Sequence, residues 1–217
     1  FYTMRLGAGK TLRELIGDHH QDLNRRDQVN LLNILNTVCQ AVAYAHSQGV
    51  IHRDLKPQNI VVGEFGEIFV LDWGLAKLID TATVMTDEPP TSPLATSSET
   101  NPVGKTIVGA RIGTPAYMAP EQAAGATDEI GFTTDVYGLG SILFEILTGQ
   151  PPYQGDDAID VMQEIQHEPT PTARDRNAAV PPALDAICSQ AMSKDPSQRY
   201  ASALDLRNEL QYWLADE

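Results

Sequence analysis

Apolar side chains recur with helical spacing over residues 28–47. They stand three or four positions apart, at Leu31, Leu35, Val38, Val42 and Ala45. This spacing predicts an amphipathic helix that buries one stripe, with Gly49 as its stop. His46, near the end of the segment, is expected to cap the helix or to face solvent.

A second segment, 135–147, is apolar nearly all round, which predicts a helix buried on every side. Gly149 is expected to end it, because Pro151 and Pro152 prevent its continuation. Further helices are expected at about 11–16, 157–168, 182–192 and 203–214. The last begins with a capping box of Ser202 and Asp205, and its buried stripe is Leu206, Leu210, Trp213 and Leu214.

Residues 59–72 carry the pattern of a β-hairpin. A β-branched run, 60–62, leads into a turn-like stretch, 63–66, and residues 67–71 then alternate between apolar and polar positions. Asn59 begins the first strand and Asp72 ends the second, so antiparallel pairing places the two side by side at one end of the ribbon. Residues 1–4 also have strand composition, and residues 7–10 have the composition of a hinge.

The polar segment HRDLKPQN, residues 52–59, leads into this hairpin and holds the chemistry of interest. The acid Asp54 can accept or orient a hydroxyl proton, and the cation Lys56 can hold a phosphate oxygen. The amide oxygen of Asn59, together with the carboxylate of Asp72, can hold magnesium against the phosphates of ATP. These are the parts needed to move a phosphoryl group onto an alcohol.

Composition narrows the classes of partner. The 217 residues include 15 Lys and Arg against 29 Asp and Glu, a formal net charge of −14, which argues against nucleic acid or an anionic membrane as a partner. Cys39 and Cys188 lie among apolar residues and are interpreted as reduced core residues of an intracellular protein. No apolar run approaches the roughly 20 residues that span a bilayer. We therefore expect a cytoplasmic domain, with any membrane anchor of a longer parent chain lying beyond Glu217.

Three motifs together resemble those of one enzyme family. HRDLKPQN resembles the H-R-D-L-x-x-x-N catalytic loop of the protein kinases, and residues 72–74, Asp-Trp-Gly, are similar to the D-F-G motif with Trp73 in place of Phe. Residues 113–121, GTPAYMAPE, resemble the stretch ending in A-P-E that closes the activation segment. Lys56 after Leu55 is the form found in Ser/Thr kinases, and the sequence of residues 113–122 is most like that of bacterial members of the family. The chain is identified as a eukaryotic-like (Hanks-type) serine/threonine protein kinase domain over residues 1–217.

The resemblance implies roles for the catalytic loop and its surroundings. Asp54 would orient the substrate hydroxyl, and Lys56 would contact the γ-phosphate. Asn59 and Asp72 would ligate magnesium. Thr114 would hydrogen-bond near Asp54 and Lys56.

The nucleotide pocket and the regulatory contacts follow from the same resemblance. Met4 would be the gatekeeper behind adenine, Leu6 would line the rim of the pocket within residues 5–7, and Val61 would form its floor. Arg53 could pair with a phosphorylated residue of the activation segment, and His52 would pack toward Trp73.

Four further residues have implied structural roles. Gly74 completes the D-F-G-like motif. Glu121 is expected to pair with Arg199, and Asp135 to tether the backbone of the catalytic loop. The activation segment would span residues 72–121, with an insertion at about 81–107 that is rich in Ser, Thr, Pro and acidic residues and is expected to be a mobile loop. Its hydroxyls are either phosphorylation sites or part of a plain solvated linker.

The expected fold is protein kinase-like (α+β): a hinge and a mainly helical large lobe with a small hairpin at the catalytic site. The glycine-rich loop, strand lysine and helix glutamate of the small lobe would precede Phe1, so this chain alone is expected to transfer little phosphate. Its partners would be ATP with Mg²⁺, a protein carrying Ser or Thr, and the missing lobe of the same parent chain.

Two other interpretations stay open. The chain could come from a pseudokinase that serves as a binding scaffold, although the presence of Asp54, Lys56, Asn59 and Asp72 argues against that. It could also be a P-loop nucleotide hydrolase, because residues 9–11, Gly-Lys-Thr, follow a strand-like run and precede a helix. The full P-loop pattern needs a glycine at position 4, which is methionine here. Lys10 would be essential in that case.

Overall fold

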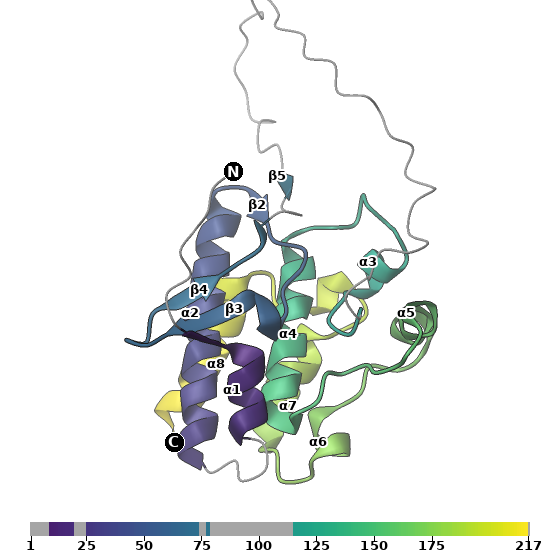
Figure 1. The fold of residues 1–217 in the computed structure, drawn as a ribbon. Coiled ribbons are helices and arrows are strands. Elements are labelled where there is room, and N and C mark those ends of the chain that lie inside the picture. The colour runs from purple at the N-terminus through teal and green to yellow at the C-terminus, as the bar shows by residue number, and fades with distance from the viewer. Residues whose placement is uncertain (1–8, 20–24, 74–76, 79–114, 217) are drawn as a thin grey trace, which may run out of the picture.

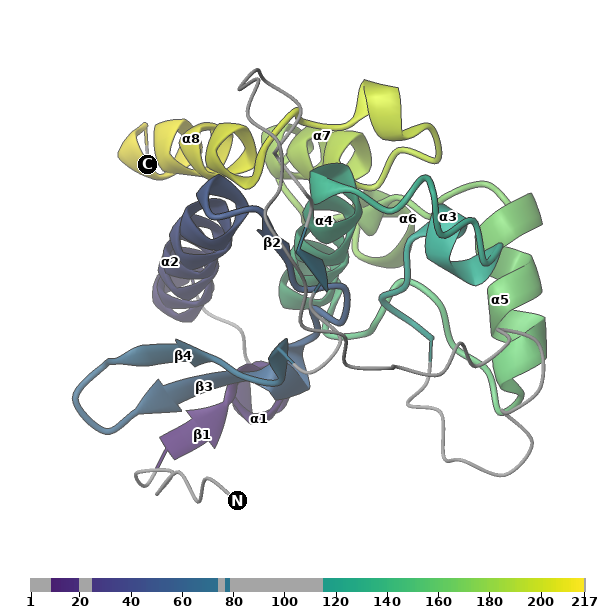
Figure 2. The ribbon, with the colours of Figure 1, turned by 90° about the horizontal axis from the view of Figure 1, so that it is seen from above.

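The computed structural model describes residues 9–19, 25–73, 77–78 and 115–216. Within them a mainly helical body lies beside small antiparallel sheets (Figure 1). In the view from above, the three-stranded sheet lies on one side of the helices and α5 lies on the far side (Figure 2). Mixed helix and antiparallel sheet in separate regions agree with the expected fold class.

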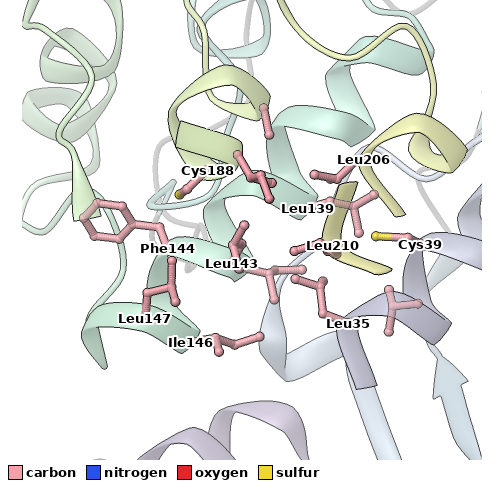
Figure 3. Packing of buried hydrophobic residues seen from close by; sticks show 14 of the residues in the cluster. Leu35, Cys39, Leu139, Leu143, Phe144, Ile146, Leu147, Cys188, Leu206 and Leu210 are labelled. Atoms are coloured by element: carbon pink, nitrogen blue, oxygen red, sulfur yellow. The ribbon is translucent and has the colours of Figure 1, made fainter. Parts of the chain in front are cut away.

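The core forms where four helices meet: α2 (Arg25–Ser47), α4 (Phe132–Thr148), α7 (Pro182–Ala191) and α8 (Ala203–Ala215). Leucines of α2, α4 and α8 point into the shared interior, with Phe144 and Cys188 at its edge (Figure 3). α4 is buried from Thr134 to Thr148, as its continuous apolar sequence predicts. At Gly149 the backbone turns left-handed, with φ of 73°, which is the usual way to end a helix on glycine.

The predicted hairpin forms and has a third strand. β3 (Ile60–Gly63) pairs antiparallel with β4 (Ile68–Val70), with Ile60 opposite Val70. β1 (Gly9–Thr11) pairs with the other edge of β3, where the sequence predicts a hinge. A Cβ on Gly9 would lie 2.7 Å from the carbonyl oxygen of Val62, so the glycine permits a close approach of the strands rather than bending the chain.

Short elements connect these parts. α1 (Leu12–His19) begins one residue later and ends three residues later than predicted. Thr11 and Glu14 cap it reciprocally, through hydrogen bonds of 2.7 Å and 3.2 Å between backbone N–H groups and side-chain oxygens. The remaining elements are β2 (Val50–Ile51), the 3₁₀ turns η2 (Pro57–Asn59) and η4 (Pro196–Gln198), β5 (Lys77–Leu78), α3 (Pro120–Ala123), α5 (Ala158–His167) and α6 (Ala173–Arg176).

Several sequence expectations concern residues outside the described part of the chain: the strand at 1–4, Met4, Leu6, Gly74, the insertion at 81–107 and Thr114. In the described part, no helix combines the length and the apolar composition needed to cross a bilayer. Both cysteines are buried and free.

Candidate active site

Three polar side chains meet at the start of the hairpin. The Lys56 ammonium lies 2.6 Å from Oδ2 of Asp54, and the Asn59 amide nitrogen donates to the same carboxylate at 3.1 Å and to the Asp54 carbonyl oxygen at 2.8 Å. The side chain of Asp54 is 30% exposed and that of Lys56 is 26% exposed, so both can reach a bound molecule. Asn59 is 8% exposed and lies in the 3₁₀ turn η2, just before the strand that it was predicted to begin.

The backbone of the loop is held by Asp135, in the first turn of α4. One oxygen of this buried carboxylate accepts the N–H of His52 at 2.8 Å, and the other accepts the N–H of Arg53 at 2.8 Å. Arg53 has a positive φ of 70°, a conformation that costs free energy for a residue with a side chain. The two charge-assisted hydrogen bonds offset that cost and fix the direction in which Asp54 leaves the backbone.

His46 also belongs to this tether, which corrects the expectation that it caps the helix or faces solvent. Its ring nitrogen Nε2 lies 2.8 Å from Oδ2 of Asp135, and the side chain is buried. The end of α2 therefore contacts the start of α4 through the same carboxylate that holds the loop. A single histidine at the end of an amphipathic stripe gives no sign in the sequence of a partner 89 positions away.

The hairpin places Asp72 next to this cluster. The N–H of Leu71 donates to the carbonyl oxygen of Asn59 at 2.7 Å, so the end of β4 lies beside the start of β3, as predicted. The ring of His52 is buried beside this strand end. Its centroid lies 4.6 Å from that of the Trp73 ring, and its Nε2 lies 2.9 Å from the carbonyl oxygen of Leu71. Asp72 is exposed and has a positive φ of 62°, so its backbone turns sharply out of the strand.

The residues present fit a magnesium ion of the kind that keeps phosphate and water as its other ligands. The side-chain amide nitrogen of Asn59 is committed to Asp54, and no hydrogen bond found in the described part of the chain uses the side-chain oxygen Oδ1. That oxygen and the exposed Asp72 carboxylate supply two hard oxygen donors at one end of the ribbon. Among the described residues no group of three or more His, Cys, Asp or Glu forms a metal cage, so phosphate oxygens would have to complete the coordination.

A cleft beside Asp54 includes the half-buried side chain of Arg53. It is lined by Arg53, Asp54, Lys56, Met118 and Gln122 among others. The Nε of Arg53 is buried without a hydrogen-bond partner among the described residues, while the Gln122 amide donates to the Arg53 carbonyl oxygen at 2.8 Å. The backbone at Arg53 is thus tied to α3, and the unpaired Nε leaves donor capacity for an anion.

The predicted pair of Glu121 and Arg199 is present and buried. Two parallel hydrogen bonds of 2.8 Å join the guanidinium to the carboxylate. Thr134 donates to Glu121 at 2.8 Å, and the guanidinium also donates to the carbonyl oxygens of Ser193 and Thr133, at 2.8 Å and 2.9 Å. Burial alone would raise the pKa of Glu121, but the hydrogen bonds and charge of Arg199 outweigh it and the pKa is lowered.

A second polar cluster was missed by the sequence analysis. Arg13 of α1 donates to the Tyr117 hydroxyl at 2.9 Å and to Glu145 at 2.7 Å, and the Tyr117 hydroxyl donates to the other oxygen of Glu145 at 2.5 Å. Glu145 is 1% exposed, and burial raises its pKa although both partners lower it. A charged residue inside an otherwise apolar helix was the signal that could have found it.

Val61 and Lys10, which the kinase and P-loop interpretations place against nucleotide, both lie in the three-stranded sheet. Val61 is 7% exposed in the middle strand β3, between Thr11 of β1 and Phe69 of β4, and its role under adenine stays a prediction. Lys10 lies in β1 and forms an exposed ion pair of 2.7 Å with Asp18. Residues 9–11 thus form an edge strand rather than the phosphate-wrapping loop that a P-loop hydrolase requires.

Comparison with known proteins gives a consistent result. The protein kinase domain family matches residues 3–210. Serine/threonine-protein kinase PknD of Protochlamydia amoebophila is 35% identical over 226 residues, covering 99% of this chain and 22% of the relative. Serine/threonine-protein kinase PknB of Mycolicibacterium smegmatis is 35% identical over 212 residues, covering 97% of this chain and 30% of the relative.

A further relative is the probable serine/threonine-protein kinase PknB of Bifidobacterium longum, which is 34% identical over 97% of this chain. The chain covers only 22%, 30% and 27% of the lengths of these three relatives. The match therefore concerns one domain of longer proteins.

Proposed function

The chain belongs to the protein kinase family, and on that premise we propose that it takes part in the ATP-dependent phosphorylation of serine and threonine hydroxyls on proteins. The observation that carries the proposal is the cluster of Asp54, Lys56 and Asn59, held by the Asp135 tether beside the end of β4. Relatives that are 35% identical to this chain over the aligned residues bear the name serine/threonine-protein kinase.

In the proposed reaction, Asp54 accepts a hydrogen bond from the substrate hydroxyl and directs its oxygen toward the γ-phosphorus. As the new O–P bond forms, the bond between the γ-phosphorus and the bridging oxygen breaks, ADP leaves, and the hydroxyl proton passes to Asp54. Lys56, now 2.6 Å from Asp54, offsets negative charge on the transferred group. Asn59 and Asp72 would hold magnesium, which supplies positive charge beside the phosphate oxygens.

The chain's own contribution is positioning. Because the Asp135 carboxylate fixes two consecutive N–H groups, the Asp54 side chain starts from a defined backbone direction, and orientation of this kind supplies much of the rate in phosphoryl transfer. We also propose that Thr114, Met4, Leu6 and Val61 contact substrate or adenine as the family resemblance implies, and that Arg53 pairs with a phosphorylated residue of segment 72–121.

The expectation of a small lobe before Phe1 is part of the proposal. That lobe would hold ATP from the side opposite to Asp72, with groups that the described residues do not supply. Phosphoryl transfer is then expected from a polypeptide extended upstream of Phe1, and little from the 217 residues alone.

A transfer assay with radiolabelled ATP and a basic acceptor protein tests both parts. In the extended polypeptide, Asp54→Asn is expected to lower kcat at least about 100-fold while ATP binding persists. Lys10→Ala is the control and is expected to leave kcat unchanged. Transfer that survives Asp54→Asn, or that is lost in Lys10→Ala, would contradict the proposed roles.

Two other outcomes have distinct meanings. Robust transfer by the 217 residues alone, abolished by Asp54→Asn, would keep the kinase function and overturn only the need for an upstream lobe. Binding of ATP with Mg²⁺ but no transfer by the extended polypeptide would support the pseudokinase alternative. Among the described residues, the retention of the four polar groups of the site favours catalysis over that alternative.

A further inference from the structure

A groove runs between α7 and α8 and shares no lining residue with the cleft beside Asp54. The α7 wall begins with two small exposed side chains, Ala183 and Ala186, one helical turn apart, and continues with the nearly buried Ile187 and the exposed Gln190. Because two alanines leave space where longer side chains would fill it, the surface is hollowed here. The groove has a volume of about 370 Å³, near the lower end of the range for pockets that hold a small ligand.

The α8 wall is chemically different. Glu209, Tyr212, Trp213 and Asp216 follow one another at intervals of three, one and three residues, so all four lie on one face of the helix. Tyr212 is 68% exposed and Trp213 is half-buried, while both carboxylates are exposed. Trp213 packs partly against the core beside the buried Leu206 and Leu210, whereas the exposed ring of Tyr212 lies outside it and is available to a partner.

The charge of the groove has one sign. In the described part of the chain, the charged side chains that line it are Glu209 and Asp216. Tyr200 also lines the groove, and burial together with the negative charge of Glu209 raises its pKa to about 12. The chain as a whole carries a formal charge of −14. Cations that also have an apolar stem complement such a surface.

We propose that this groove binds an extended basic segment of a partner protein, with two Lys or Arg residues three positions apart. Glu209 and Asp216 are seven residues apart on the helix, which corresponds to about 10 Å along its axis. In an extended segment with polyproline II geometry, which has three residues per turn, residues i and i+3 lie on the same side and are about 9 Å apart, at roughly 3.1 Å per residue. Each cation then faces one carboxylate.

The rings between the carboxylates supply the rest of the contact. Tyr212 and Trp213 can pack against the aliphatic stems of the basic side chains and attract their charged ends through the faces of the rings. The two alanines of α7 leave room for the backbone of the segment. This inference is independent of the phosphoryl-transfer proposal, since it uses none of the residues of the candidate active site.

Fluorescence anisotropy with labelled hexapeptides tests the proposal on the whole chain. The probe is Gly-Arg-Gly-Gly-Arg-Gly, with its termini blocked. One control replaces both arginines by glutamine, and a second places the arginines next to each other. The probe is expected to bind more tightly than both controls, more weakly in 500 mM than in 50 mM salt, and equally with and without excess ATP and Mg²⁺.

Variants locate the site. Glu209→Gln combined with Asp216→Asn is expected to raise Kd at least about fivefold, and Tyr212→Ala about threefold. A matched control, Glu64→Gln combined with Asp160→Asn, removes the same charge from exposed positions on the hairpin and on α5 and is expected to leave Kd unchanged.

Three results would overturn the proposal. The first is equal affinity for the arginine and glutamine probes. The second is equal weakening by the groove variants and by the matched control, since that would mean attraction by net charge alone. The third is concentration-dependent dimerisation in sedimentation velocity that Tyr212→Ala abolishes, because it would assign the groove to a second copy of this chain.

Discussion

Replacement of Arg199 by methionine is expected to remove a large part of the stability of the domain. The side chain has similar length but cannot pair with Glu121, whose carboxylate is 2% exposed. The guanidinium now makes two hydrogen bonds to that carboxylate and others to backbone carbonyl oxygens, among them those of Ser193 and Thr133. The Glu121 carboxylate stays buried when its donor is lost.

The size of the loss in unfolding free energy follows from the Glu121 carboxylate, which is left buried and unpaired. Breaking a buried ion pair by removing one partner costs about 3–5 kcal/mol, against a total unfolding free energy of about 5–15 kcal/mol for a typical domain. A double variant that also carries Glu121→Met is expected to recover part of the loss, because no buried charge is then left without a partner. The exposed Arg26 of α2 is the control, and Arg26→Met is expected to change stability by less than about 0.5 kcal/mol.

The pH dependence gives an independent signature. With Arg199 present the pKa of Glu121 is lowered from its ordinary value of 4.5, so its contribution is present above pH 4.5 and is lost as the pH falls through the lower folded value. Without Arg199, burial raises this pKa above 4.5. The carboxylate then destabilises the folded state at neutral pH, and stability returns as the pH falls through the raised value. The difference between Arg199→Met and the wild type is therefore largest near pH 7 and narrows toward pH 4.

Urea denaturation followed by tryptophan fluorescence at pH 7 and pH 4 measures both effects. A loss of less than about 1 kcal/mol at pH 7 would show that the pair contributes little. An equal loss at both pH values would show that methionine disturbs packing rather than leaving a charge unpaired.

Three further predictions concern other parts of the fold. Asp135→Ala is expected to speed hydrogen exchange at the amides of His52 and Arg53 at least about tenfold, since both lose their acceptor; unchanged protection would contradict the tether. Burial raises the pKa of the Cys39 thiol to about 12. The thiol is therefore expected to react with an aromatic disulfide reagent at pH 8 only after denaturation. Rapid labelling of Cys39 in the native chain would contradict this prediction. Gly149→Ala is expected to lower stability by about 1 kcal/mol because φ is 73°, and a urea midpoint equal to that of the wild type would show that the turn tolerates a side chain.

The sequence predicted the parts of the site that rest on local periodicity. Alternation over residues 67–71 placed Asp72 beside Asn59, and the continuous apolar character of residues 135–147 identified the buried helix that carries Asp135. The pairing of Glu121 with Arg199, 78 positions apart, came from the family resemblance and is present. The chemical roles assigned to Asp54, Lys56, Asn59 and Asp72 stay predictions.

The features that sequence reasoning missed depend on contacts between distant segments. Gly9 lies in an edge strand that pairs with β3, and β3 comes so close that a Cβ at position 9 would not fit. No local sequence pattern around Gly9 indicates that β3 is its neighbour. His46 was expected to cap its helix or face solvent. That expectation was wrong because its hydrogen-bond partner, Asp135, comes from another helix, which the local sequence does not show. Glu145 was not singled out, although it is a charged residue in an otherwise apolar segment, and no local pattern identifies Tyr117 and Arg13 as its partners.

Helix α4 carries Asp135 near its start and Glu145 ten residues later, about 15 Å along the same axis. The first holds the loop that bears Asp54, and the second holds Tyr117 and Arg13. One helix therefore supports both the loop that bears Asp54 and Tyr117, which line the same cleft. A movement of α4 as a whole would carry both together, whereas a change in the helical geometry between Asp135 and Glu145 would alter the distance between them.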